Sequence, residues 1–296
     1  MVTGSNGLLG QTLISLLSSK KGVKLIATSK GANRYLDTAG YEYAELDLCD
    51  STAVTNVLDT YLPDVIIHTA AITNVDTCHI ERDLCRKLNI HAVEDLVKLC
   101  EKQNIHFIHL STDFVFDGQN GPYLETDEPK PVSFYGESKY EAEKLIQASA
   151  CKWAIIRTIL VYGVTANMSR SNIVLWAKSA LEKGEFINVV NDQWRMPTLV
   201  QDLAEACWLI AEQGANGVFH VSGREMMTIC DLVYKVADFW KLDKTLIVPI
   251  NSASLNQEAK RPAKTGFILD KAMNVLGYRP HSFVDGLKLV DKQLLG

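Results

Sequence analysis

Val2-Thr3-Gly4-Ser5-Asn6-Gly7-Leu8-Leu9-Gly10, close to the N-terminus, is the stretch that decides the fold class of this chain. Its glycines follow the spacing G-x-x-G-x-x-G, and an apolar pattern typical of a helix continues to Ser18. Glycine lets the backbone turn tightly and approach a phosphate closely, and a helix N-terminus presents free N–H groups to it. The loop therefore predicts a dinucleotide pyrophosphate site, if the segments around it form a βαβ unit.

Apolar strands and amphipathic helices alternate through the first half of the chain. The patterns predict strands at 24–28, 64–68, 106–110 and 153–157, and helices at 8–18, at 51–61 and along the four-residue spacing of Leu88, Ala92, Leu96 and Cys100. Near-continuous apolar strands between helices are typical of a parallel sheet covered on both faces. The sequence thus predicts a Rossmann-like, doubly wound α/β fold with its ligand at the carboxyl ends of the strands.

The pattern changes after about residue 160. Helices are expected near 171–183, 199–213 and 228–240, with short strands at 218–221 and 246–248. Thr228 and Asp231 have the spacing of a capping box. We expect a Rossmann domain over residues 1–160 and a smaller α/β lobe over 161–296, some of whose segments return to the first domain.

The first strand is short for the central position that such a sheet gives it. Only Met1, Val2 and Thr3 precede Gly4, where five or six residues are expected. A shortened central strand loses ladder hydrogen bonds and packing on both faces. We therefore expect that the chain is truncated or that its start codon is misassigned.

The composition is that of a globular protein. Of 296 residues, 47% are hydrophobic and 22% are charged, and the net charge of −5 argues against a non-specific nucleic-acid binder. The seven cysteines include no C-x-x-C pair, which favours reduced thiols in the cytoplasm and no metal centre. No apolar run approaches the length of a membrane span. We expect a monomer or homodimer without nucleic-acid or membrane partners.

Thr112, Tyr135 and Lys139 are the candidate catalytic residues. Ser111-Thr112-Asp113 ends a predicted strand, and Tyr135 and Lys139 are four residues apart, on one face of a predicted helix. An ammonium beside a phenol favours the phenolate, so we expect a lowered pKa for Tyr135. Such a tyrosine can donate a proton to a developing alkoxide, while a hydroxyl of Ser111 or Thr112 holds the substrate carbonyl.

A second Tyr-x-x-x-Lys pair, Tyr140 and Lys144, lies on the same predicted helix. Tyr140 is five residues beyond Tyr135, about 140° around the helix, so both tyrosines cannot face one site. We choose Tyr135 because it begins the helix next to a proline-rich loop, and we expect Tyr140 at the surface or in packing.

In order and spacing, these motifs resemble the extended short-chain dehydrogenase/reductase family, and the likeness covers nearly the whole chain. More narrowly, Ser111-Thr112-Asp113-Phe114-Val115-Phe116-Asp117-Gly118 is similar to the S-T-D-x-V-F-D-G signature of its dTDP-4-dehydrorhamnose reductases. The resemblance implies NADPH-dependent reduction of the 4-keto group of a nucleotide-linked deoxysugar. It implies that Tyr135 protonates the oxygen, Thr112 binds the carbonyl, and Lys139 tunes Tyr135 and binds the nicotinamide ribose.

The resemblance also implies two sets of binding residues. Cofactor contacts are expected from the glycine loop, from the ends of the next strands and from the catalytic pair: Gly4, Ser5, Asn6, Gly7, Leu8, Leu9, Gly10, Ser29, Lys30, Asp47, Leu48, Ala70, Ala71, Ile72, Tyr135 and Lys139. Substrate contacts are expected from Val75, Asp113, Phe114, Leu160, Trp194, Arg195 and Arg261.

The second strand bears on the choice of cofactor. It ends at Thr28-Ser29-Lys30 with Arg34 nearby, and no carboxylate precedes Asp37. An NAD site usually places a carboxylate there for the ribose 2′-hydroxyl, whereas a hydroxyl and two cations suit a 2′-phosphate. We expect NADPH, with NADH as the alternative cofactor; the other interpretation is that these are solvated loop charges.

Departures from the family pattern concern the substrate. Phe114 and Leu160 stand where many relatives have tyrosine and tryptophan, and Arg195 replaces a usual glycine. Arg195 and Arg261 are candidates for the substrate pyrophosphate because a guanidinium matches phosphate bidentately. Trp194 is either a stacking platform or a buried packing residue. The sequence therefore leaves open which nucleotide sugar the pocket binds.

Two other functions remain open. One is a nucleotide-sugar epimerase or dehydratase with tightly bound NAD, although dehydratases pair the strand-end hydroxyl with Asp-Glu and here Phe114 follows Asp113. The other is a non-catalytic nucleotide-binding subunit, like the regulatory subunit of methionine adenosyltransferase, because fold does not fix function.

Overall fold

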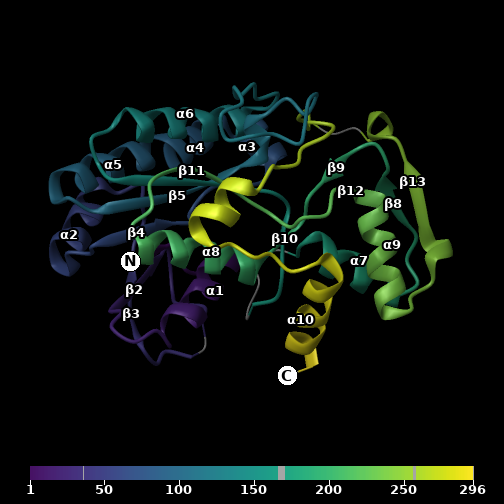
Figure 1. Ribbon diagram of the computed structural model, residues 1–296, viewed down its shortest axis with the longest axis horizontal. Helices are drawn as coiled ribbons and strands as arrows, with labels where there is room; N and C mark the ends of the chain where they lie inside the picture. Colours follow the sequence, from purple (N-terminus) through teal and green to yellow (C-terminus); the bar gives the residue numbers. More distant parts are fainter. Residues whose placement is uncertain (36, 166–170, 256–257, 296) are drawn as a thin grey trace.

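A seven-stranded parallel sheet forms the centre of the computed structural model, which describes residues 1–35, 37–165, 171–255 and 258–295 (Figure 1). In spatial order its strands are β11 (Gly217–Val221), β6 (Trp153–Thr158), β5 (His106–Thr112), β4 (Val65–His68), β1 (Val2–Thr3), β2 (Leu25–Ser29) and β3 (Tyr41–Glu45). Every pairing in it is parallel. The predicted Rossmann-like α/β fold is confirmed.

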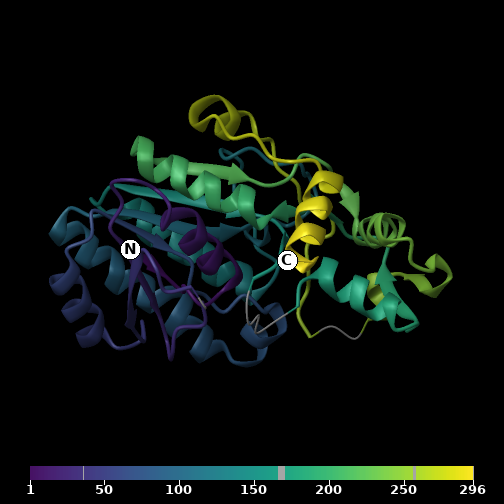
Figure 2. The same ribbon diagram turned by 90° about the horizontal axis from the view of Figure 1, so that it is seen from below.

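Helices cover both faces of this sheet (Figures 1 and 2). One apolar cluster joins it to α2 (Ser51–Tyr61), α5 (Ala92–Gln103) and α6 (Phe134–Ala148), and a second joins it to α1 (Leu8–Leu17) and α8 (Val200–Gln213). Neighbouring strand residues divide between the clusters: Phe107 belongs to the first and Ile108 to the second. This alternation explains the continuous apolar runs of the inner strands, because both faces of these strands are buried.

The second half of the chain forms a smaller group of elements and also contributes β11 to the main sheet (Figure 1). Its helices are α7 (Ile173–Glu182), α9 (Ile229–Trp240) and α10 (Phe283–Leu295), and its small sheets pair β8 (Ile187–Val190) with β13 (Ile247–Ile250), β7 (Val161–Tyr162) with β10 (Thr198–Leu199), and β9 (Trp194–Arg195) with β12 (Met227–Thr228). The capping box of Thr228 and Asp231 is present at the start of α9. The domain boundary at residue 160 stays a prediction.

Short helical segments complete the described elements. α3 (Val75–Ile80) and α4 (Arg82–Arg86) lead into a π-helical turn, Lys87–His91, which continues directly into α5. The others are 3₁₀ turns at Asp113–Val115, Lys244–Leu246 and Ser252–Ser254, and a second π-helical turn at Ala272–Leu276. The π-helical turn at Lys87–His91 is of interest because such turns often occur at functional sites.

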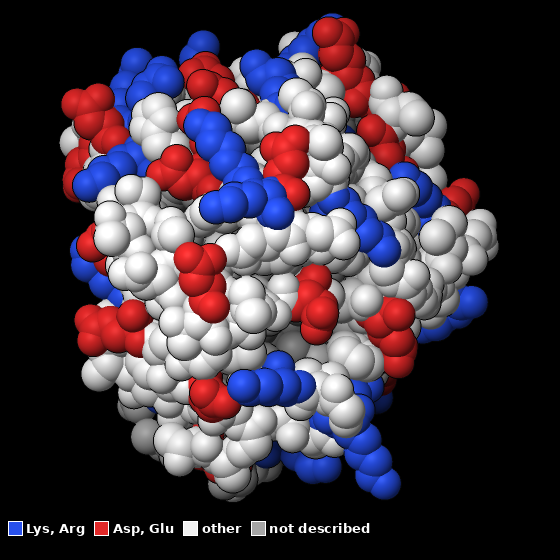
Figure 3. Space-filling model, turned by 90° about the vertical axis from the view of Figure 1, so that its left-hand side faces the viewer, with Lys and Arg blue, Asp and Glu red and all other residues white. Residues whose placement is uncertain are grey.

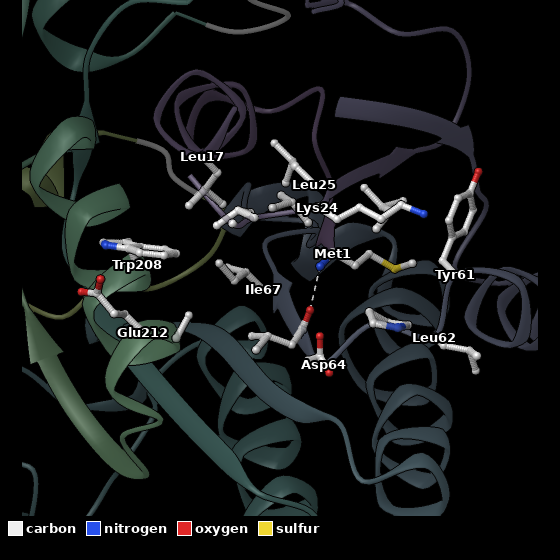
Figure 4. A pocket seen from close by; sticks show the side chains of 17 residues that line it. Met1, Leu17, Lys24, Leu25, Tyr61, Leu62, Asp64, Ile67, Trp208 and Glu212 are labelled. Atoms are coloured by element: carbon white, nitrogen blue, oxygen red, sulfur yellow. Dashed lines mark hydrogen bonds between the residues drawn. The ribbon is translucent and has the colours of Figure 1, made fainter. Parts of the chain in front are cut away.

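The amino end of β1 borders a cavity of about 290 Å³ (Figure 4). Leu17 and Trp208 line it on one side and Tyr61 and Leu62 on the other. The Met1 ammonium donates a hydrogen bond to the Val65 carbonyl at 2.7 Å, and burial lowers its pKa to about 5. β1 spans two residues where β2 spans five, so this inner strand is as short as the sequence predicts.

The surface carries both signs of charge. On the face at the left of Figure 1, basic and acidic side chains are intermingled (Figure 3). Large apolar side chains are exposed at scattered positions that include Ile80, Phe186 and Leu295. Among the described residues, none of the helices combines the length and the apolar character needed to cross a membrane.

Candidate functional site

The glycine loop connects β1 to α1, and two of its glycines are required by close packing. Gly4 has φ +72°, and a Cβ atom there would lie 2.7 Å from the Ala70 amide nitrogen. A Cβ atom on Gly10 would lie 2.6 Å from the Ser5 Cα atom and would overlap the Gly4 carbonyl oxygen. The loop therefore folds back on itself and against the end of β4, which brings its backbone to the carboxyl edge of the sheet.

The N-terminus of α1 is suited to an anion. Gly7 occupies the N-cap position, and no side chain caps this helix, whereas Asp50, Ser133 and Asn172 cap α2, α6 and α7. The N–H groups of the first turn, at Leu8, Leu9 and Gly10, thus have no side-chain acceptor and combine with the positive end of the helix dipole. This arrangement fits the predicted pyrophosphate.

The loop after β2 packs against the glycine loop. The Asn6 side chain donates to the Ala32 carbonyl at 2.9 Å and accepts from the Arg34 amide at 2.9 Å. Lys30 and Asp47 form an ion pair at 2.8 Å, and this contact lowers the pKa of Asp47. The predicted cofactor residues Ser29, Lys30 and Asp47 thus lie together. Because the Lys30 side chain is exposed, this ion pair is weak enough to open for a phosphate.

The segment Ala70, Ala71 and Ile72 leaves the end of β4 beside the glycine loop, and Asn89 holds it in place. The Asn89 side chain accepts from the Ile72 amide at 2.9 Å and donates to the Ile72 carbonyl at 3.0 Å and to the Ser138 hydroxyl at 3.2 Å. Asn89 lies in the π-helical turn and is buried. Sequence reasoning missed it; the available signal was a polar residue on the helical face that carries Cys85, Ala92 and Val93.

Thr112 and Tyr135 are brought together by the end of β5 and the start of α6. The Thr112 hydroxyl accepts from the Phe114 amide at 3.2 Å, which fixes the turn after β5. Ser133 caps α6, and the Phe114 ring packs edge-on against Tyr135 at 5.7 Å between centroids. Gly136 allows this contact, because a Cβ atom there would overlap the Phe114 carbonyl.

The expected lowering of the Tyr135 pKa is wrong for this structure. Burial raises the pKa of Tyr135 well above its ordinary value; a hydrogen bond with the Thr112 hydroxyl lowers it, and nearby Asp113 raises it. The Lys139 ammonium, which contacts His109 Nε2 at 2.9 Å, does not offset this rise. Burial lowers the pKa of Lys139 to about 8. Tyr135 is therefore a protonated phenol, the state required of a proton donor.

The second Tyr-x-x-x-Lys pair lies outside this arrangement. The Lys144 ammonium lies 5.1 Å from the centre of the Tyr140 ring, and Tyr140 packs against the apolar cluster that contains Val115 and Phe267. Tyr140 is therefore a packing residue, in line with the sequence interpretation.

A buried ion pair lies one turn beyond Lys139 on α6. Glu143 accepts from Arg157 Nε at 3.0 Å and from Arg157 Nη2 at 2.6 Å, and it also accepts from the Ser111 hydroxyl at 2.5 Å. Both ionised side chains are almost fully buried. Ser111 is thereby committed to Glu143, and Thr112, whose hydroxyl donates to Asp113 Oδ1 at 3.2 Å, is the strand-end hydroxyl next to Tyr135.

Arg195 is buried among backbone carbonyls. Its guanidinium donates to the Trp194 carbonyl at 2.7 Å and to the Pro262 carbonyl at 2.8 Å, and it lies 3.8 Å from the Asp113 carboxylate. Asp113 also accepts from the Thr265 hydroxyl. Arg195 thus ties the segment around Pro262 to the turn after β5, and its predicted contact with a pyrophosphate stays a prediction.

The other predicted substrate residues surround the same region. Arg261 donates to Asp76 at 2.6 Å, which links the 258–265 segment to α3, the helix that Val75 begins. The Trp194 side chain is 40% exposed, which favours the stacking platform over the buried packing residue. Leu160 adopts a left-handed backbone conformation, φ 41°, and packs beside Ile159 and Tyr162.

The family of the chain follows from comparison with known proteins. The model of the RmlD substrate binding domain matches residues 1–295. The chain belongs to this family. A probable low-salt glycan biosynthesis reductase, Agl14, of Haloferax volcanii is 30% identical over 98% of this chain and 96% of its own length. A dTDP-4-dehydrorhamnose reductase of Aggregatibacter actinomycetemcomitans is 30% identical over 97% and 96%.

Another relative has a different role. The beta subunit of methionine adenosyltransferase 2 of Danio rerio is 32% identical over 88% of this chain and 80% of its own length. Among solved structures, a dTDP-4-dehydrorhamnose reductase of Clostridium acetobutylicum has a TM-score of 0.85 at 26% identity and covers 100% and 99% of the two chains. One from Bacillus anthracis in complex with NADP has a TM-score of 0.83 at 25% identity and covers 99% and 98%. The resemblance to reductases with an extended short-chain dehydrogenase/reductase fold is thus confirmed.

Proposed function

We propose that this protein is an NADPH-dependent oxidoreductase that reduces the 4-keto group of a nucleotide-linked deoxysugar, with dTDP-4-dehydrorhamnose as the first candidate. The observation that carries the proposal is the buried, protonated Tyr135 beside Thr112, at the same edge of the sheet as the glycine loop. The reductase relative and the NADP-bound reductase structure support both the reaction and the cofactor.

The chemistry divides between the cofactor and the side chains. When bound, the nicotinamide supplies a hydride to the carbonyl carbon. Tyr135 gives its phenolic proton to the carbonyl oxygen as negative charge develops there, and Thr112 donates a hydrogen bond to the same oxygen. Lys139, as an ammonium, stabilises the resulting phenolate. The uncapped first turn of α1 binds the pyrophosphate.

The preference for NADPH is assigned to Ser29, Lys30 and Arg34. These groups lie at the end of β2 and in the loop that Asn6 holds. A 2′-phosphate takes over the Lys30 ammonium from Asp47 at small cost, because the pair is exposed. Replacing Lys30 and Arg34 by alanine is expected to raise KM for NADPH far more than KM for NADH; equal effects refute the assignment.

The test of the function follows NADPH oxidation at 340 nm with dTDP-4-dehydrorhamnose generated in situ. Wild type is expected to turn over, and Tyr135→Phe is expected to lose turnover and keep NADPH binding. Tyr140→Phe is the matched control on the same helix and is expected to keep activity, since Tyr140 packs against the Val115 cluster. A Tyr135→Phe variant with wild-type turnover refutes the assignment of the acid.

A second candidate is a nucleotide-binding regulatory subunit, favoured by the 32% identity to a methionine adenosyltransferase subunit. Stable copurification with a larger enzyme, together with no turnover on any 4-ketosugar, supports that function.

An epimerase or dehydratase is disfavoured by Phe114 after Asp113, and copurifying, non-exchangeable NAD would revive it. We retain a cytoplasmic monomer or homodimer as part of the proposal.

A further inference from the structure

A row of buried polar side chains crosses the centre of the sheet on the face covered by α6. Thr3 of β1 is in register with His68 of β4, and His68 is in register with His109 of β5. All three are at most 1% exposed. The centre of a parallel sheet is normally apolar, so polar side chains on three adjacent strands need an explanation.

The contacts within the row lead to Lys139. The Thr3 hydroxyl and His68 Nδ1 are 2.8 Å apart, and the rings of His68 and His109 stack with centroids 5.3 Å apart. His109 Nε2 then lies 2.9 Å from the Lys139 ammonium. Because Thr3 directly precedes Gly4, the row connects the start of the glycine loop to the catalytic face of α6.

The direction of the last hydrogen bond follows from its partners. An ammonium can only donate, so His109 Nε2 accepts and the ring proton resides on Nδ1. Burial, the Lys139 ammonium and His68 together hold the pKa of His109 well below its ordinary value, so the ring stays neutral at physiological pH. His109 is thus a permanent hydrogen-bond acceptor for Lys139.

We propose that His109 is a positioning residue that holds the Lys139 ammonium on the face of α6 that bears Tyr135, with His68 and Thr3 as its support. The inference deepens the proposed function and rests on it, because the value of a fixed ammonium lies in the proton transfer from Tyr135. The other groups that face Lys139 are Glu143 on α6 and Cys78 and Cys85 on α3 and α4, whose charges raise its pKa.

Three variants of His109 separate its role as a hydrogen-bond acceptor from the packing of its ring, and a variant of His106 is the control. His109→Phe keeps an aromatic ring against His68 and removes the acceptor. His109→Gln restores an acceptor, the side-chain amide oxygen. His106→Phe is the matched control: His106 is a buried histidine of the same strand, on the opposite face from His109. His109→Leu serves as a second acceptor-free variant in case the phenylalanine does not pack.

The pH profile of kcat with the 4-ketosugar is the first readout. Loss of an acceptor destabilises the ammonium, so the Lys139 pKa falls below about 8 and the alkaline limb of kcat moves to lower pH. A one-unit fall lowers kcat at pH 9 about tenfold. We expect this for His109→Phe, near wild-type profiles for His109→Gln and His106→Phe, and little change in KM. A folded His109→Phe or His109→Leu enzyme with the wild-type profile overturns the inference.

A second readout needs no substrate and separates the two proposals. ¹³Cε-lysine NMR, with the Lys139 resonance assigned from Lys139→Met, follows the titration of the ammonium directly. A lower Lys139 pKa in His109→Phe supports the contact even if wild type turns over no sugar, in which case only the proposed function fails. An unchanged Lys139 pKa in an active enzyme overturns the inference alone.

Discussion

Replacing Glu143 by glutamine tests the main polar anchor between α6 and the sheet. The substitution keeps the size of the side chain, removes its charge and leaves the Arg157 guanidinium buried without a counter-ion. Breaking a buried ion pair in this way costs about 3–5 kcal/mol. Three hydrogen bonds from Arg157 and one from Ser111 converge on Glu143, so we expect a loss of about 4 kcal/mol and a fall in Tm of about 6 °C.

The assay is urea unfolding followed by tryptophan fluorescence, which reports the free energy of unfolding for wild type and Glu143→Gln. Glu94→Gln is the control: it removes an exposed helical ion pair with Lys98, and we expect no measurable change. Glu143→Leu combined with Arg157→Met is expected to recover most of the loss, because apolar side chains can replace a buried pair. A Glu143→Gln variant within about 1 kcal/mol of wild type would refute the reasoning.

Three further outcomes are expected. Gly10→Ala should abolish NADPH binding measured by nucleotide fluorescence, because its Cβ atom would overlap the Gly4 carbonyl; retained binding contradicts the close packing. Burial lowers the pKa of His68 to about 3, so its contribution to stability is complete above pH 6.5 and is lost as the pH falls. The free energy of unfolding should drop by about 2 kcal/mol from this group at pH 5, and His68→Phe should remove that part of the slope. Arg261→Ala should raise KM for the sugar nucleotide and leave KM for NADPH unchanged; the reverse pattern contradicts a substrate role.

Much of the fold was predictable because the buried strands follow a simple physical rule. Strands buried on both faces, such as β4 and β5, are apolar at consecutive positions, and the predicted bounds are within two residues of the observed ones. β3 was not located because it is an edge strand: Tyr41–Glu45 contains two glutamates and has no fully buried residue. The pairing of β11 with β6 joins residues 63 positions apart, such as Gly217 and Ala154, for which local patterns contain no signal.

The site was predictable where it depends on spacing along one element. Tyr135 and Lys139 share a face of α6 because they are four residues apart. The contacts that modify them come from elsewhere in the chain: His109 is 30 residues from Lys139, and Asn89 is 49 residues from Ser138. Local sequence patterns likewise could not predict that the carbonyls of residues 262 and 263 contact Arg195. Such patterns indicate only that an arginine near the substrate region is a candidate ligand.

The same face of α6 serves both chemistry and stability. Tyr135, Lys139 and Glu143 follow one another at intervals of four residues, and β5 supplies Thr112, His109 and Ser111 as their partners. All of these contacts lie in the interface between α6 and β5. A substitution of any of these residues therefore changes packing as well as proton transfer. Loss of activity in Tyr135 or Lys139 variants is therefore evidence for a chemical role only when the free energy of unfolding is unchanged. Glu143→Gln changes both properties, because it weakens the interface between α6 and β5 and also removes a charge that raises the pKa of Lys139, so its turnover is compared with its free energy of unfolding.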